Sequence, residues 1–248
     1  MTDKKKPSGN IWKYTTMLLA GLLLGYVIGR FELTTLNFIV SPNEQKDEKT
    51  QDQDKNTQEK EEDTAPQGPV DVNTDGDLIL GNNNAKITII DFSDYQCPFS
   101  ERFYSEIFVN LKQDFIDKGV VKYIFKDYPL NFHPNALPAA IAAECAGQQN
   151  KYWEMHSKLF ETQEVWSGLE NTEDTYNGYA KEIGLNLTKY TACIGEQSIK
   201  DEIMTDRSDG TAAGASGTPT LFINGMIVRG VPQSYDQFKQ YLESQIGN

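Results

Sequence analysis

A stretch without a single apolar side chain divides this sequence and limits the folded part to the residues that follow it. Residues 43–64 are all charged residues, Gln, Asn or Thr. Such a segment buries no apolar surface, so nothing offsets the entropy that ordering it would cost. We therefore expect a low-complexity, disordered acidic linker over 31–69 and one compact folded domain over 70–248.

The residues before the linker predict a membrane anchor. Lys4, Lys5 and Lys6 precede an apolar run that is densest over 17–28 and extends back to Ile11. This pattern predicts a transmembrane helix over 11–30, with the basic residues 1–10 in the cytoplasm. No small-x-small cleavage site follows the run, which favours an uncleaved signal anchor over a cleaved signal peptide. We expect a single-pass protein of the cell membrane with an extracytoplasmic domain.

The charge of the chain argues against nucleic acid as a partner. The formal net charge is −13, with 36 acidic side chains against 23 basic ones. Proteins that bind nucleic acid neutralise phosphates with a basic surface. The only concentrated basic cluster belongs to the predicted anchor.

The start of the folded domain has the pattern of a βαβ unit. A β-branched run over 86–92 predicts a strand, and Pro98 suits the first position of a following helix. Apolar residues then recur at helical spacing as far as Gly119, and a second strand is predicted over 120–125. Strand, helix and strand in this order imply a parallel pair with a right-handed crossover.

The rest of the domain predicts a helical block followed by a hairpin. The periodicity is helical throughout 134–214. After this block we expect a strand over 220–223 and a second strand over 226–229, joined by the two-residue turn Asn224-Gly225. A last helix is expected over 235–245. The fold class is therefore α/β, with a mixed central sheet and a helical insertion at about 133–215.

Two motifs carry a family resemblance that covers about 78–248. Asp91-Phe-Ser-Asp-Tyr-Gln-Cys-Pro-Phe-Ser100 and Gly217-Thr-Pro-Thr-Leu-Phe-Ile-Asn-Gly225 together resemble the DsbA-like branch of the thioredoxin superfamily. The resemblance implies a thioredoxin-like fold and a thiol:disulfide oxidoreductase without cofactor or metal. The implied partners are extracytoplasmic client proteins bearing cysteines, together with a separate thiol or membrane redox partner.

Cys97 is the candidate nucleophile. It lies at the predicted start of a helix, where unpaired N–H groups and the helix dipole favour a thiolate. Asp91 matches the family's buried acid, which assists proton transfer at the second cysteine of the motif. The alternative for Asp91 is an ordinary carboxylate at the end of a strand.

Four further residues are expected to contact substrate. By resemblance, Thr218 and Pro219 form the family's cis-proline loop, which lies beside the cysteine and offers a backbone edge to a peptide. Pro98 and Phe99 follow the nucleophile directly.

The sequence departs from the family at Ser100. The family motif Cys-x-x-Cys here ends in serine, and oxygen takes no part in thiol–disulfide exchange. Cys97 can still hold a substrate as a mixed disulfide, which favours single-cysteine or isomerase-like chemistry. The alternatives are a catalytically silent peptide-binding or chaperone module, and an engineered cysteine-to-serine trap form of a dithiol oxidase. A glutathione-conjugating enzyme of related fold fits less well, because the first cysteine is retained.

Cys145 and Cys193 both fall in the predicted helical insertion. In an oxidising compartment we expect them to form a structural disulfide. The alternatives are two free buried thiols, or resolution of Cys97 by one of them. His133 and His156 lack further ligands at metal spacing, so we expect core or surface roles for them.

Overall fold

The computed structural model describes residues 68–74 and 76–246. The cytoplasmic segment 1–10, the anchor 11–30 and nearly all of the linker 31–69 lie outside these residues, so their predictions remain untested. Among the helices of the described part, none combines the length and the apolar composition needed to cross a bilayer.

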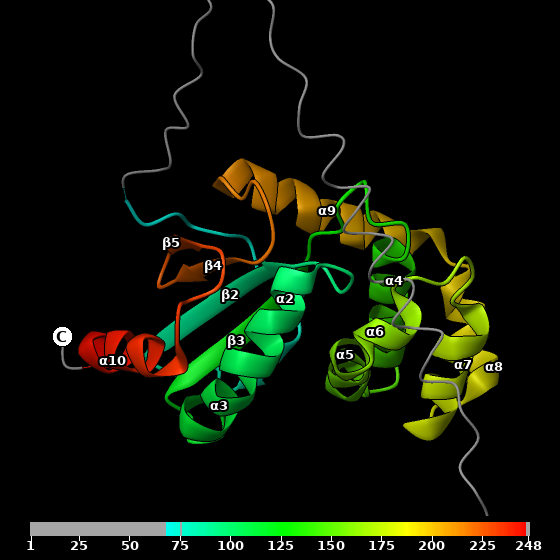
Figure 1. The fold of residues 1–248 in the computed structure, drawn as a ribbon, viewed down its shortest axis with the longest axis horizontal. Coiled ribbons are helices and arrows are strands. Elements are labelled where there is room, and N and C mark those ends of the chain that lie inside the picture. The colour runs from blue at the N-terminus through cyan, green and yellow to red at the C-terminus, as the bar shows by residue number, and fades with distance from the viewer. Residues whose placement is uncertain (1–67, 75, 247–248) are drawn as a thin grey trace, which may run out of the picture. The chain divides into compact units, whose positions relative to one another are not determined.

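A mixed five-stranded sheet forms the centre of the domain (Figure 1). Its strands are, in sheet order, β1 (Ile79–Gly81), β3 (Val121–Asp127), β2 (Ile87–Ser93), β4 (Thr220–Ile223) and β5 (Met226–Arg229). Only β2 and β3 run parallel, and the other pairs are antiparallel. The predicted βαβ unit and hairpin are therefore correct. Sequence reasoning missed β1, because three residues are too few to show an alternating pattern.

The predicted helix after Pro98 is continuous but includes two π-helical stretches. Its parts are α2 (Pro98–Phe103), η1 (Tyr104–Phe108), α3 (Val109–Leu111) and η2 (Lys112–Ile116). Phe103, Ile107 and Leu111 are buried in the core, as their spacing predicted. Phe99 has the same spacing but is 59% exposed. It lies in the first turn, directly after the carboxyl end of β2.

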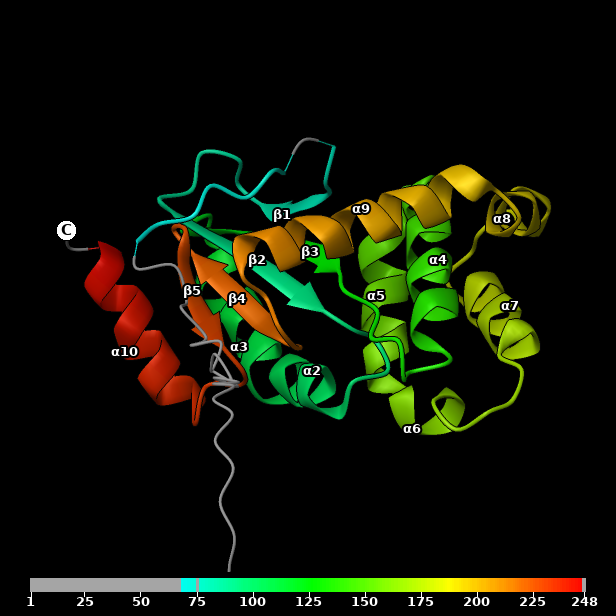
Figure 2. The same ribbon diagram turned by 90° about the horizontal axis from the view of Figure 1, so that it is seen from above.

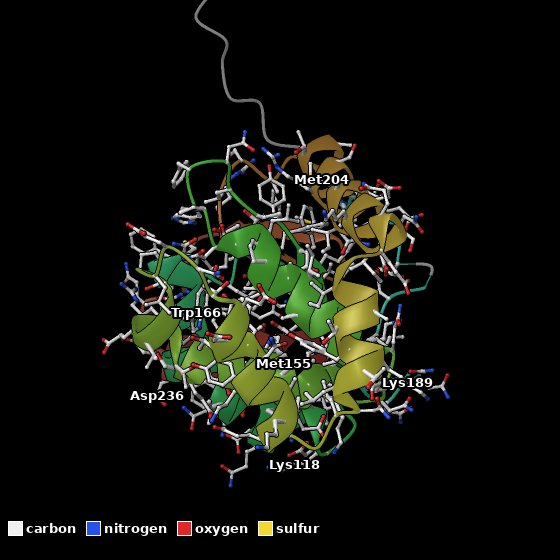
Figure 3. All side chains as sticks on the ribbon, turned by 90° about the vertical axis from the view of Figure 1, so that its right-hand side faces the viewer. Lys118, Met155, Trp166, Lys189, Met204 and Asp236 are labelled. Carbon is white, nitrogen blue, oxygen red and sulfur yellow. A yellow bond between two sulfur atoms is a disulfide. The ribbon has the colours of Figure 1, made fainter. Side chains whose placement is uncertain are left out.

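The helical insertion lies between β3 and β4, as predicted. It consists of α4 (Ala136–Gly147), α5 (Tyr152–Glu161), α6 (Gln163–Trp166), α7 (Glu173–Glu182), α8 (Leu187–Ile194) and α9 (Gln197–Ala213). The last helix is α10 (Tyr235–Ile246). Figure 3 looks onto the insertion, with Met155 in its interior. His156 is buried among aromatic rings, which confirms a core role, and burial lowers its pKa to about 3.

Different elements cover the two faces of the sheet (Figure 2). One face carries Ile89 and Tyr123 and packs against the α2–η2 helix, the insertion and α10. The other face carries Phe92 and packs against the end of α9. Gly210 permits this contact, because a Cβ at this position would lie 2.7 Å from the Phe92 ring. The sheet is therefore covered on both sides.

A buried ion pair fixes the second face. The Lys126 ammonium on β3 lies 2.7 Å from a carboxylate oxygen of Asp206 on α9 and 2.8 Å from one of Asp77. Both carboxylates are nearly inaccessible to solvent. A buried charge is tolerated when it is paired in this way. The pairs hold α9 and the segment before β1 against β3.

Candidate active site

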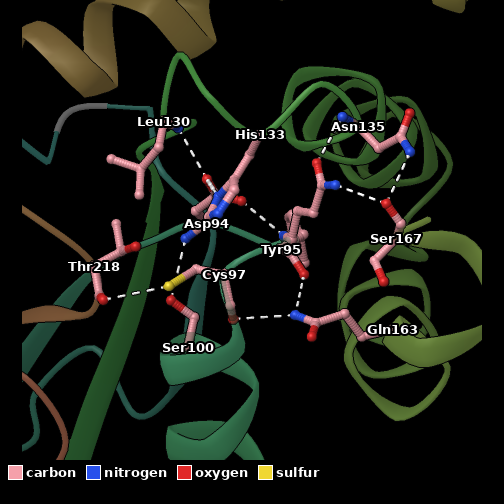
Figure 4. A network of polar contacts seen from close by, with 11 residues as sticks. Asp94, Tyr95, Cys97, Ser100, Leu130, His133, Asn135, Gln163, Ser167 and Thr218 are labelled. Carbon is pink, nitrogen blue, oxygen red and sulfur yellow. Dashed lines mark hydrogen bonds and ion pairs between the residues drawn. The ribbon is translucent and has the colours of Figure 1, made fainter. Parts of the chain in front are cut away.

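Cys97 is the N-cap residue of α2, at the junction between the central strand β2 and the helix. Pro98 occupies the first helical position, where its missing N–H leaves no hydrogen bond unmade. The Cys97 side chain is 4% exposed, and its Sγ donates to the Thr218 carbonyl oxygen at 3.5 Å (Figure 4). The thiol thus lies at the N-terminus of a helix, against the loop that precedes β4.

The sheet register brings the second motif to this cysteine. Strand β4 pairs with β2 antiparallel, with Thr220 opposite Phe92. The loop before β4 and the loop after β2 therefore lie at the same edge of the sheet. The Thr218-Pro219 peptide bond is cis, as the resemblance implied. Pro219 is buried and Thr218 half-buried, and the Thr218 carbonyl is the one that contacts Cys97.

Ser100 lies one helical turn after Cys97 and is buried. Its Oγ accepts a hydrogen bond of 3.4 Å from the backbone N–H of Asp94 (Figure 4). A hydroxyl therefore stands where the family motif has its second sulfur. Cys97 is the one free cysteine of the described residues, so this site has no second thiol.

Asp91 lies on β2 and is only 1% exposed. Its carboxylate accepts 2.5 Å hydrogen bonds from the hydroxyls of Ser93 and Tyr123. Burial raises the pKa of Asp91 to about 6, although both hydrogen bonds act to lower it. The carboxyl is buried as the resemblance implied, but its hydrogen bonds in the described part of the chain reach neither Cys97 nor Ser100. Its role in proton transfer stays a prediction.

A second buried carboxylate, Asp94, organises the loop around Cys97. It accepts hydrogen bonds from the backbone of Gln96 at 2.7 Å and of Leu130 at 2.9 Å, and from His133 Nδ1 at 2.7 Å. Burial raises its pKa despite these donors. Sequence reasoning missed Asp94 and left His133 without a partner. An Asp two residues before an N–H near a helix start is a local signal of this turn, whereas the contact with His133 spans 39 residues.

The insertion holds the same loop from its other side. Gln163 on α6 donates from Nε2 to the carbonyls of Tyr95 at 2.7 Å and of Cys97 at 3.1 Å. The Gln96 side chain accepts a hydrogen bond from the backbone of Asn135 at 2.6 Å. These amides also escaped the sequence analysis, because glutamine has no pattern that predicts a distant carbonyl. The backbone of the nucleophile is therefore fixed by the sheet and by the insertion (Figure 4).

Exposed apolar side chains belong to the elements that touch this loop. Phe99 follows Cys97, and Phe132 is 74% exposed, with its ring 4.6 Å from that of His133 between centroids. Val165 on α6 is also exposed. Pro98 is exposed beside Phe99. Exposed apolar side chains on these elements are typical of a surface that binds polypeptide.

The other two cysteines are joined to each other. Cys145 on α4 and Cys193 on α8 form a disulfide with an S–S distance of 1.98 Å. Both side chains are buried. This is the structural pairing favoured from the sequence, and it leaves Cys97 as a single thiol. The disulfide links two helices of the insertion.

The likeness to known proteins agrees with the fold and the motifs. A family model described as thioredoxin matches residues 73–244. The chain is 30% identical over 181 residues to disulfide bond formation protein D of Bacillus subtilis (strain 168), which covers 69% of this chain and 78% of that protein. The crystal structure of oxidised BdbD from Bacillus subtilis superimposes with a TM-score of 0.65 and 26% identity, over 73% of this chain and 98% of that one.

Relatives with a different domain organisation also match. The chain is 32% identical over 157 residues to Na(+)/H(+) antiporter NhaA 1 of Salinispora arenicola (strain CNS-205). The match covers 63% of this chain but only 23% of that protein. The thioredoxin-like domain is therefore a unit that also occurs within larger proteins. From the family model, the curated relative, the fold and the two motifs together, this chain belongs to the DsbA-like branch of the thioredoxin family.

Proposed function

We propose that this protein is a thiol–disulfide oxidoreductase that acts on client proteins outside the cytoplasm through the single thiol of Cys97. The observation that carries the proposal is the placement of Cys97 at the start of α2 against the Thr218 carbonyl, with a hydroxyl at position 100. The name of the Bacillus subtilis relative, disulfide bond formation protein D, supports the reaction class.

The proposed reaction is a pair of exchange steps. The Cys97 thiolate attacks one sulfur of a client disulfide, so that a mixed disulfide forms and the other client sulfur leaves as a thiolate. A second thiolate, from the client or from another molecule, then attacks the mixed disulfide and releases Cys97. One disulfide is broken and one is formed, so the sequence is redox-neutral. It rearranges disulfides and needs no electron acceptor.

Ser100 determines how long the mixed disulfide lasts. A cysteine at this position would attack the adjacent bond within the same molecule, and a serine hydroxyl does not. We expect release to depend on a thiol from outside the site, either a separate thiol or a membrane redox partner. Ser100 donates a hydrogen bond to the Cys97 thiolate in this proposal, while Asp91 is an acid left without the second cysteine that it serves in the family.

Client binding is assigned to the groups around the thiol. Pro98 and Phe99 supply exposed surface, and the Thr218-Pro219 loop supplies a backbone edge along which an extended segment pairs. Clients are therefore polypeptides with accessible cysteines and apolar neighbours.

The proposed location follows from the N-terminal sequence. Residues 1–10 remain in the cytoplasm, 11–30 form the signal anchor, and 31–69 hold the domain of 70–248 away from the membrane surface. This arrangement places Cys97 in a compartment where protein disulfides persist.

A catalytically silent binding module is the second candidate. The exposed side chains of Phe99, Phe132 and Val165 favour it, because such a surface binds clients whether or not the thiol turns over. The two candidates differ in whether the Cys97 sulfur is needed.

Trapping of mixed disulfides in native membranes tests the proposal. Membranes are quenched with acid and an alkylating agent, and proteins bonded to Cys97 are identified by mass spectrometry, with Cys97→Ser as the control. The proposal expects cysteine-bearing extracytoplasmic proteins that are absent from the control. An empty result, with clients still retained non-covalently by Cys97→Ala, would assign the protein to the binding module.

A further inference from the structure

A cavity lies within the helical insertion, and it meets the surroundings of Cys97 only at Asn135, whose backbone N–H donates to Gln96. Its volume is about 610 Å³, and α4, α7, α8 and the segment between α6 and α7 form its walls. This volume falls within the range of small-molecule sites, about 300–1,000 Å³. The insertion that contains it faces the viewer in Figure 3.

The walls of the cavity are mainly apolar. The apolar or aromatic residues that line it are Pro134, Pro138, Ile141, Leu169, Tyr176, Tyr190 and Ile194. The Tyr176 ring is held edge-to-face against Trp166, with 5.6 Å between ring centroids. An apolar ring system would therefore meet carbon atoms on several sides.

The disulfide fixes two of these walls. Cys145 lies one helical turn after Ile141 on α4, and Cys193 lies next to Ile194 on α8. The covalent link therefore keeps both helices in place whether or not a ligand is bound. A preformed cavity binds more tightly than one that has to be opened.

Two buried hydroxyls in the wall, those of Tyr176 and Tyr190, have no hydrogen-bond partner in the described part of the chain, and Tyr190 is the less exposed of the two residues. Tyr190 lines the cavity and is 1% exposed, and its hydroxyl makes no hydrogen bond within the described part of the chain. Burial raises the pKa of Tyr190, so the group stays a neutral hydroxyl. A buried hydroxyl without a partner is destabilising, and an acceptor supplied by a ligand would remove this cost.

The charges at the cavity disfavour an anion. Glu170 and Glu173 lie among the lining residues, against the single cation Lys200. An anionic ligand would meet a net negative rim. An uncharged ligand would lose no solvation of a charge on entering.

We propose that this cavity binds a small uncharged molecule with an apolar ring system and one hydrogen-bond acceptor that pairs with the Tyr190 hydroxyl. The site is independent of the exchange reaction at Cys97, since it shares no residue with the nucleophile or the Thr218-Pro219 loop. It adds a ligand-binding function to the insertion.

Benzophenone and diphenylmethane form a matched pair of probes. The two molecules have the same two rings, but only benzophenone carries a carbonyl acceptor. Binding of both to the folded protein is measured by NMR titration. Irradiation of bound benzophenone then inserts it into neighbouring C–H bonds, and the modified peptides are located by mass spectrometry.

Three variants locate the site. Tyr190→Phe removes only the Tyr190 hydroxyl, so the fold is retained. Tyr179→Phe is the matched control, because its hydroxyl is also buried without a partner in the described residues but does not line the cavity. Thr191→Trp, at an exposed lining position, fills the entrance.

The proposal expects photo-adducts on α4, α7 or α8. Tyr190→Phe should weaken benzophenone binding by about three- to tenfold, the value of one hydrogen bond, and leave diphenylmethane unchanged. Tyr179→Phe should change neither probe, and Thr191→Trp should weaken both. Adducts confined to other elements, or equal effects of Tyr190→Phe and Tyr179→Phe on benzophenone, would overturn the proposal.

Discussion

The three cysteines occupy two contrasting environments. Cys97 lies at the end of a strand and the start of a helix, with its sulfur against a backbone carbonyl. Cys145 and Cys193 lie within two packed helices and are bonded to each other. The same kind of side chain is thus placed to react in one region and to form a cross-link in the other. The difference lies in the surroundings: Cys97 lies at a helix N-terminus beside the Thr218 carbonyl, whereas the packed interior around Cys145 and Cys193 excludes attacking thiols.

Removal of the Cys97 sulfur should have the largest effect on exchange. We expect Cys97→Ala to abolish thiol–disulfide exchange with a peptide disulfide completely, because no other free thiol lies in the described residues. The unfolding midpoint should change little, since the substitution leaves the disulfide in place. Exchange is measured by mass spectrometry and stability by urea unfolding. Residual exchange at the wild-type rate would mean that another group reacts.

Removing the other two sulfurs should give the reverse result. The bridge spans 48 residues, and a cross-link of this span stabilises by about 4 kcal/mol in the chain-entropy model. We expect the double variant Cys145→Ala/Cys193→Ala to lose roughly this amount in urea unfolding while Cys97 reacts at a rate within about twofold of wild type. If exchange fell as steeply as stability, the two regions would not be separate.

Asp91 gives the region of Cys97 its own dependence on pH. The carboxyl titrates near 4 in an unfolded chain, and burial raises its folded pKa to about 6. The folded state therefore binds this proton more tightly, and stability falls as pH rises from about 4 to 6. Asp91→Asn should be more stable than wild type above pH 6, by about 3 kcal/mol.

Urea unfolding at pH 4, 5, 6 and 7 measures this difference. Other buried acids, such as Asp206 and Glu144, also have raised pKa values, so the informative quantity is the variant minus wild type at each pH. A difference that is constant from pH 4 to 7 would contradict the assignment to Asp91.

Asp94 should have the smallest effect of the set. The Asp94 carboxylate accepts from three donors, on Gln96, Leu130 and His133. Asp94→Asn keeps one acceptor oxygen, but its amide N–H then faces at least one of these donors. We expect a loss of about 1–2 kcal/mol in stability and a several-fold change in the exchange rate of Cys97. The matched control is Asp114→Asn, a partly exposed carboxylate that accepts from Tyr235 and Lys239 and makes no contact with the Cys97 loop among the hydrogen bonds of the described residues. A change in exchange rate no larger than that of the control would remove Asp94 from the site.

Sequence reasoning was most successful where structure is local. The strand before Cys97, the helix from Pro98 and the Asn224-Gly225 turn each follow from a few neighbouring residues, and the turn has positive φ at both positions. The pairing of Cys97 with Thr218, 121 residues away, followed only from the family resemblance.

Contacts with no local pattern were missed. Gln163 reaches the carbonyl of Cys97 across 66 residues, and His133 reaches Asp94 across 39. Nothing in the periodicity of either segment reports on these partners, because they depend on how the insertion docks against the sheet. Burial of Asp94 was missed for the same reason, since a loop carboxylate is usually exposed.

In the proposed reaction, Cys97 forms a mixed disulfide that the site itself does not resolve. Wild type and Ser100→Cys are each mixed with a peptide disulfide, and intact masses are followed with time. Once the leaving peptide thiol has been removed, we expect a lasting single adduct on wild type that only added thiol removes. We expect rapid loss of the adduct from Ser100→Cys, at least about a hundredfold faster, because the new thiol attacks within the molecule. An adduct that wild type releases under these conditions without added thiol, or no adduct at all, would show that Cys97 does not react in this way.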